Sequence, residues 1–133
     1  MPRCTISTIL PAVAVGFVAR ACVSVVLADS AAEGVDFFEK RIRPLLAEQC
    51  FECHSAQSKK VKGGLLLDSR EAILQGGDSG PALVAGDPDK SRLVVAARHT
   101  DKELRMPPKR KLSDAQIADL EAWVKMEIGR AHV

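Results

Sequence analysis

The chain has 133 residues, a formal net charge of +2 and an aromatic content of only 4%. Its length suits one domain, and so small a charge gives no reason to expect nucleic acid as a partner. The sequence contains no internal repeat and no tract of low complexity that would mark a second domain.

Residues 1–28 form an apolar leader that predicts export. Residues 21–28 have the length of the hydrophobic region of a signal peptide, and Val26 and Ala28 supply the small residues expected before a cleavage site. We therefore expect a cleaved signal peptide and a periplasmic or cell-envelope location. The alternative is a retained membrane anchor, in which a buried Arg20 would cost about 3 kcal/mol.

A linker is expected over residues 29–35, and a helix from Asp36, which with Glu39 resembles a capping box. Apolar residues near helical spacing give this helix one buried face: Phe37, Phe38, Ile42, Leu45 and Leu46. Pro44 lacks a backbone donor, so the helix should kink or restart there. The helix leads directly to Cys50.

Residues 50–54 read Cys-Phe-Glu-Cys-His, which is the attachment pattern of a c-type haem. The thiols of Cys50 and Cys53 can each add to a porphyrin vinyl group, and their spacing of about one turn sets both sulfurs against the same ring edge. The imidazole of His54 then falls under the iron as proximal ligand. We expect one covalent haem c, which would also supply the large apolar centre that a domain poor in aromatic residues lacks.

Two other chemistries use paired cysteines. Cys4 and Cys22 lie in the leader, so the mature chain keeps only Cys50 and Cys53, too few for a disulfide scaffold. A thiol–disulfide oxidoreductase would place this pair in a βαβ unit, and the chain shows no clear parallel strands. A structural zinc site that included His99 would not match the paired ligand spacing of closed zinc sites.

After a basic loop over residues 55–64 and an apolar run over 65–67, Ser69 should cap a short helix that Gly76 and Gly77 end. A turn-rich segment follows. Asp87 and Pro88 then predict the start of a further helix, with aspartate as cap and proline at the first helical position. This helix should carry three residues inward and end near His99: Leu93, Val94 and Ala97.

Ser113 and Gln116 form a capping box for the last helix. Its apolar residues lie on adjoining turns and predict a packing face: Ile117, Leu120, Trp123 and Val124. The expected fold is therefore a small all-α domain over residues 36–126.

Met106 is the favoured sixth ligand of the iron. It lies in a loop stiffened by Pro107 and Pro108, and a methionine opposite a histidine raises the reduction potential. Met126 is expected to fill the core. His99 is expected at the surface, where the end of a helix favours a positive charge.

A metal-binding histidine usually donates its other ring proton to a second group. For His54 we expect the carbonyl of Pro81 in that role, with an ordinary turn at Gly80 and Pro81 as the alternative.

Basic residues gather in two stretches: Lys59, Lys60 and Lys62, then Lys102, Arg105, Lys109, Arg110 and Lys111. The second stretch surrounds Met106. It would steer an acidic redox partner to the haem edge, and a solvated face without such a role is the alternative.

These segments resemble, in order, the planctomycete-type cytochrome c domain, a branch of the class I cytochromes c. The resemblance rests on PLLAEQCFECH, KGGLLLDSREA, GGDSGP, GDPDKS, LRMPPK and LSDAQIADLEAWV. It implies a small all-α haem domain in which Cys50, Cys53 and His54 attach the cofactor and Met106 completes the ligation. Its function would be one-electron transfer without substrate chemistry, with a labile sixth position for gas or peroxide chemistry as the alternative.

Residues 127–133 break the preceding helical pattern, and the last six resemble a translated sequencing adapter. We expect a non-native tail, with an ordinary frayed end as the alternative, so His132 is not a candidate ligand. The family's domain often heads longer secreted proteins, and the natural chain is expected to continue beyond Met126.

Overall fold

The structure, a computed structural model, describes residues 32–126, so the predicted leader and tail lie outside the described residues. The elements follow in chain order: η1 (Phe38–Ile42), α2 (Arg43–Gln49), α3 (Phe51–His54), η2 (Lys62–Gly64), α4 (Arg70–Gln75), α5 (Arg92–Arg98) and α6 (Asp114–Lys125). The described residues form no strand and only one isolated bridge, between Gly77 and Gly80. The predicted all-α class is confirmed. No helix among these residues has the length and apolar character needed to cross a membrane.

The first helix starts earlier than predicted. Residues 32–37 are already helical, so part of the expected linker is helix and Asp36 lies inside it. There the Asp36 carboxylate pairs with the Lys40 ammonium at 2.7 Å, one turn further on. The prediction of a capping start at Asp36 is therefore wrong, because its side chain stabilises the helix from within.

The predicted restart at Pro44 is confirmed. The turn before it, η1, is a π-helix in which the Arg43 N–H reaches back five residues to the carbonyl of Phe38. Helix α2 then begins with Pro44 in its first turn, the part of a helix that tolerates proline best.

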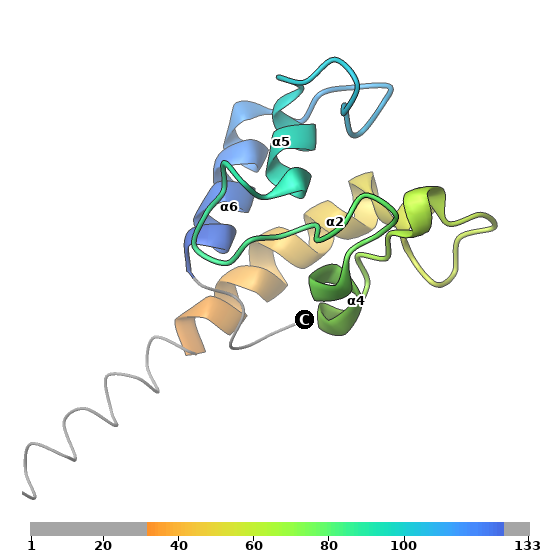
Figure 1. The fold of residues 1–133 in the computed structure, drawn as a ribbon. Helices are drawn as coiled ribbons and strands as arrows, with labels where there is room; N and C mark the ends of the chain where they lie inside the picture. The colour runs from red at the N-terminus through yellow and green to blue at the C-terminus, as the bar shows by residue number, and fades with distance from the viewer. Residues whose placement is uncertain (1–31, 127–133) are drawn as a thin grey trace, which may run out of the picture. The chain divides into compact units, whose positions relative to one another are not determined.

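The core forms where η1, α2, α5 and α6 pack together (Figure 1). Phe38 and Trp123 lie at its centre, with ring centroids 5.5 Å apart. The other buried apolar residues are Ile42, Leu45, Leu46, Leu67, Ile73, Ala82, Leu93, Val94, Ala96, Ala97, Leu112, Ile117, Leu120 and Val124. The inward faces predicted for the first and last helices are thus confirmed, except that Phe37 is only partly buried.

Two of the three side-chain caps predicted for the later helices are found. Ser69 accepts from the Ala72 N–H at the start of α4, and Ser113 and Gln116 form the complete capping box of α6. Helix α5 instead starts at Arg92, four residues after Pro88, so its predicted start is wrong. Asp87 accepts from the Lys90 N–H within a turn.

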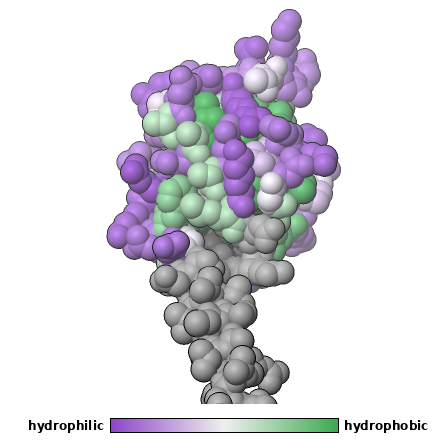
Figure 2. Space-filling view, turned by 90° about the vertical axis from the view of Figure 1, so that its left-hand side faces the viewer, coloured by the Kyte–Doolittle hydropathy of each residue, from purple (hydrophilic) through white to green (hydrophobic). Residues whose placement is uncertain are grey.

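Figure 2 shows a face on which hydrophobic residues reach the surface between hydrophilic ones. The large apolar residues exposed in the described part of the chain are Leu74, Val84, Met106 and Met126. Met126 is 49% exposed, so the prediction that it fills the core is wrong. It is the C-cap residue of α6, after the buried residues Trp123 and Val124.

Candidate functional site

Cys50, Cys53 and His54 lie within one turn of helix. Cys50 joins α2 to α3, and its carbonyl accepts from the N–H of Cys53 at 3.1 Å and of His54 at 2.9 Å. Residues three and four apart on a helix lie on the same side. Both thiols are free and half-buried. The turn therefore carries two thiols and one imidazole on a single short segment.

Cys50 packs against the hydrophobic core. This burial raises the pKa of its thiol to about 11, because a thiolate would lose its solvation there. Cys50 is therefore protonated at neutral pH. A thiol in this state is a poor nucleophile for disulfide exchange, where reactive cysteines have lowered pKa values.

The ring of His54 is held from the side opposite to its expected metal contact. Its Nδ1 lies 3.1 Å from the carbonyl oxygen of Leu65. A carbonyl oxygen only accepts, so Nδ1 carries the proton and Nε2 offers its lone pair. The His54 carbonyl accepts in turn from the Leu67 N–H at 2.7 Å. Backbone and ring of His54 are thus both fixed by the run 65–67.

Pro81 does not supply the carbonyl that meets His54. The structure brings Leu65 to that place instead, while Pro81 is exposed after the turn at residues 77–80. Leu65 is the site residue that the sequence reasoning missed. The pair Gly63–Gly64 directly before the apolar run is the sequence signal that indicates a turn of the chain just before Leu65.

That glycine pair turns the chain back toward α3. Gly63 and Gly64 both have φ near +60°, a conformation that glycine adopts at little cost. The Gly63 carbonyl accepts from the Asp78 N–H at 2.8 Å, which ties the turn to the following loop. A Cβ on Gly64 would meet Oδ1 of Asp78 at 2.6 Å. The turn that delivers Leu65 to His54 therefore depends on glycine.

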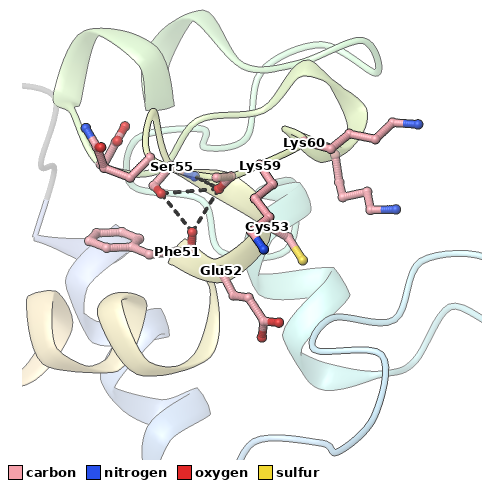
Figure 3. A pocket seen from close by; sticks show the side chains of 10 residues that line it. Phe51, Glu52, Cys53, Ser55, Lys59 and Lys60 are labelled. Atoms are coloured by element: carbon pink, nitrogen blue, oxygen red, sulfur yellow. Dashed lines mark hydrogen bonds between the residues drawn. The ribbon is translucent and has the colours of Figure 1, made fainter.

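A recess of about 770 Å³ lies beside Cys53, between α3 and the basic loop (Figure 3). Within it the hydroxyls of Ser55 and Ser58 both donate to the Phe51 carbonyl, at 2.8 and 2.9 Å. These bonds close the end of α3. The remaining lining residues are mainly polar: Glu52, Gln57, Lys59, Lys60, Lys62 and Asp68.

Met106 lies in the loop between α5 and α6. Its N–H donates to the carbonyl of Ala96 at 3.0 Å, which fastens the loop to the last turn of α5. Its side chain is 37% exposed. The loop thus presents a thioether near the surface from an anchored backbone.

Both basic stretches are exposed, including Lys59, Lys60 and Lys62 beside Cys53. In the second stretch, Nζ of Lys111 lies 3.8 Å from Oδ1 of Asp114, which is a long distance for an ion pair. Exposed basic residues therefore flank Met106 in the sequence, with the exposed acidic residues Asp101 and Glu103 before it.

The residues present fit a c-type haem. The donor set consists of two unoxidised thiols one turn apart and an imidazole whose second nitrogen is already bound. In the part of the chain that the structure describes, no three His, Cys, Asp or Glu side chains converge as a closed metal site would require.

The comparison with protein families gave a match. A family model described as planctomycete cytochrome C matches residues 50–110, a segment that runs from the paired cysteines through the Met106 loop. No curated protein and no solved structure matches the chain. The resemblance predicted from the sequence is confirmed for this segment.

Proposed function

Since residues 50–110 belong to the planctomycete cytochrome C family, we propose that the domain carries single electrons through one covalent haem c. Cys50 and Cys53 would form the two thioethers, and His54 and Met106 would ligate the iron. When bound, haem supplies exchange of one electron between ferric and ferrous iron. The chain's own residues attach the group, orient its ligands and limit access to it, without substrate chemistry of their own.

The anchored imidazole of His54 carries this proposal. A hydrogen bond from Nδ1 to the Leu65 carbonyl fixes the tautomer and makes Nε2 the free donor. Such a bond also raises the basicity of a ligating histidine. The same turn supplies the thiols of Cys50 and Cys53, so one short segment contains attachment and proximal ligation together.

The raised pKa of Cys50 argues against a thiol–disulfide oxidoreductase. That chemistry needs a thiolate near neutral pH, and burial keeps this thiol protonated. Thioether formation is the addition of a thiol to a vinyl group of the porphyrin under the control of an attachment enzyme. It does not require that the free protein hold a thiolate near neutral pH.

Met106 is favoured as sixth ligand because a hydrogen bond from its N–H ties its loop to α5, and Pro107 and Pro108 stiffen the chain after it. A thioether opposite an imidazole favours ferrous iron and raises the potential. The alternative is a labile sixth position that binds gas or peroxide. The partial exposure of Met106 is the observation that favours it.

The proposed redox partner is an acidic protein. Exposed basic side chains surround Met106, and complementary charge speeds the encounter of redox partners. We propose an exported domain in the periplasm or cell envelope. We propose that the leader is cleaved, with a retained membrane anchor as the alternative.

The test is expression with the haem-attachment machinery, followed by a visible spectrum of the denatured chain. Colour should stay with wild type, while Cys50→Ala/Cys53→Ala should lose it on denaturation. Glu52→Gln changes an exposed residue between the cysteines and is the matched control, which should keep the colour. A colourless wild-type chain would overturn the proposal.

A further inference from the structure

The loop that carries Met106 is fastened at two points on either side of this residue. The first is the hydrogen bond from the Met106 N–H to the Ala96 carbonyl, at 3.0 Å. The second joins the side chain of His99 to the carbonyl of Pro107, with Nε2 and the oxygen 3.1 Å apart. Since the carbonyl only accepts, Nε2 of His99 carries the proton.

The backbone of His99 explains why its ring reaches the loop. His99 ends α5 in the left-handed conformation, with φ 58°, and its own N–H donates to the Ala96 carbonyl at 3.2 Å. One carbonyl at the end of α5 therefore holds both His99 and Met106. The His99 ring, half-buried, then spans to the residue after Met106.

We propose that His99 is a positioning residue for Met106. Its imidazole holds the Pro107 carbonyl and thereby keeps the loop closed on α5 with the thioether in place for the iron. Without this bond the loop is fixed on one side of Met106 only, and the thioether leaves the metal more often. The inference rests on the proposed function, because it assumes Met106 as the sixth ligand.

Two variants with an amide side chain at position 99 test whether the length of this side chain matters. The amide of His99→Gln extends about as far as Nε2 and can donate to the Pro107 carbonyl. The amide of His99→Asn is too short, yet asparagine tolerates the left-handed conformation well, so the end of α5 is kept. Thr100→Ala, an exposed neighbour in the same loop, is the control.

The readouts are the thioether-to-ferric charge-transfer band, imidazole binding to the ferric protein and amide exchange at Met106 in the reduced protein. His99→Asn should raise the fraction with open sixth position about fivefold, which corresponds to one net hydrogen bond of ~1 kcal/mol. It should weaken the band and speed Met106 amide exchange by a similar factor. The open fraction of His99→Gln should stay within about twofold of the wild-type value. That of Thr100→Ala should equal the wild-type value.

His99→Asn with the same band, imidazole binding and amide exchange as Thr100→Ala would overturn the inference. So would His99→Gln that behaves like His99→Asn. If the wild-type band persists in either case, the Met106 assignment stands and only the role of His99 fails. A wild-type protein without the band overturns both.

Discussion

Nδ1 of His54 lies 3.1 Å from the carbonyl oxygen of Leu65, eleven residues further along the chain. The bond links the turn that contains the two cysteines to a segment with no helical structure. It is reinforced by the Leu67 N–H, which donates to the His54 carbonyl. The orientation of the histidine thus depends on how accurately the glycine turn at residues 63–64 returns the chain.

This dependence predicts unequal effects of alanine at two adjacent glycines. Gly63→Ala should lose about 1 kcal/mol, the cost of a left-handed non-glycine residue, since its Cβ would meet nothing within 4 Å. Gly64→Ala should lose slightly more, because its Cβ would also force the exposed Asp78 carboxylate to turn away. Denaturant unfolding measures both.

In an Asp78→Ala background the excess cost of Gly64→Ala should disappear. If the two glycine variants were equally stable in the wild-type background, contact with Asp78 would not constrain the turn. The reduction potential of Gly64→Ala reports separately whether the bond from Leu65 to His54 is disturbed.

The aromatic pair at the centre of the core gives a second prediction. Trp123 is fully buried against Phe38, so Trp123→Ala should cost about 3–5 kcal/mol in the free energy of unfolding. Trp123→Phe should cost less. It keeps a ring against Phe38, and the indole N–H that it removes has no acceptor among the described residues.

Thermal unfolding of the two variants tests this order. If Trp123→Phe were as damaging as Trp123→Ala, the indole N–H would have an important acceptor in the folded protein. The pairing with Phe38 would then not be the main contribution of Trp123.

Features with local causes could be predicted from the sequence. The Ser69 cap, the box of Ser113 and Gln116 and the restart at Pro44 each depend on residues within one turn of each other. The cysteine turn also belongs to this group, because three functional side chains lie in five consecutive residues. Each is formed by backbone groups whose partners lie next to them in the chain.

The errors arose where a local signal has two outcomes or where the partner is distant. Asp87 followed by proline suits a turn as well as a helix, and buried Ser91 closes that turn by donating its hydroxyl to the Asp87 carbonyl at 2.8 Å. The partner of His54 depends on a tertiary contact. Sequence shows that glycines turn the chain before Leu65, but not which carbonyl they bring to the ring.

The guanidinium of Arg98 joins α5 to two other segments, which gives a third prediction. Nε and Nη2 lie 2.8 Å from Oε1 of Glu121 in α6, and Nη1 lies 2.7 Å from Asp89. A lysine cannot reach both carboxylates with this geometry. Arg98→Lys should lose about 1 kcal/mol, or roughly 5 °C in Tm. Arg92→Lys, exposed on the same helix, should leave Tm unchanged.

Asp87 predicts a pH dependence of stability. Its hydrogen bond with Lys90 lowers the pKa of the carboxyl, and the two charged groups lie 2.9 Å apart. A lowered folded-state pKa stabilises the protein above the unfolded value of about 4 and loses this contribution as the pH falls further. The stability difference between wild type and Asp87→Asn should be constant near neutral pH and shrink in acid.

Denaturant unfolding at a series of pH values measures this difference. Lys90→Gln removes the partner and should reproduce most of the effect. A difference that grows as the pH falls would contradict the assignment, since it would require a raised pKa.

The two exposed methionines provide the sharpest test of axial ligation. Met106 and Met126 are 37% and 49% exposed, so replacing either by alanine should cost little packing. Met106→Ala should lower the reduction potential and let ferrous protein bind carbon monoxide readily, because the thioether favours ferrous iron and occupies the sixth position. Met126→Ala should leave both properties unchanged. Wild type that binds carbon monoxide as fast as Met106→Ala would show an open sixth position, and gas or peroxide chemistry would then replace electron transfer as the favoured function.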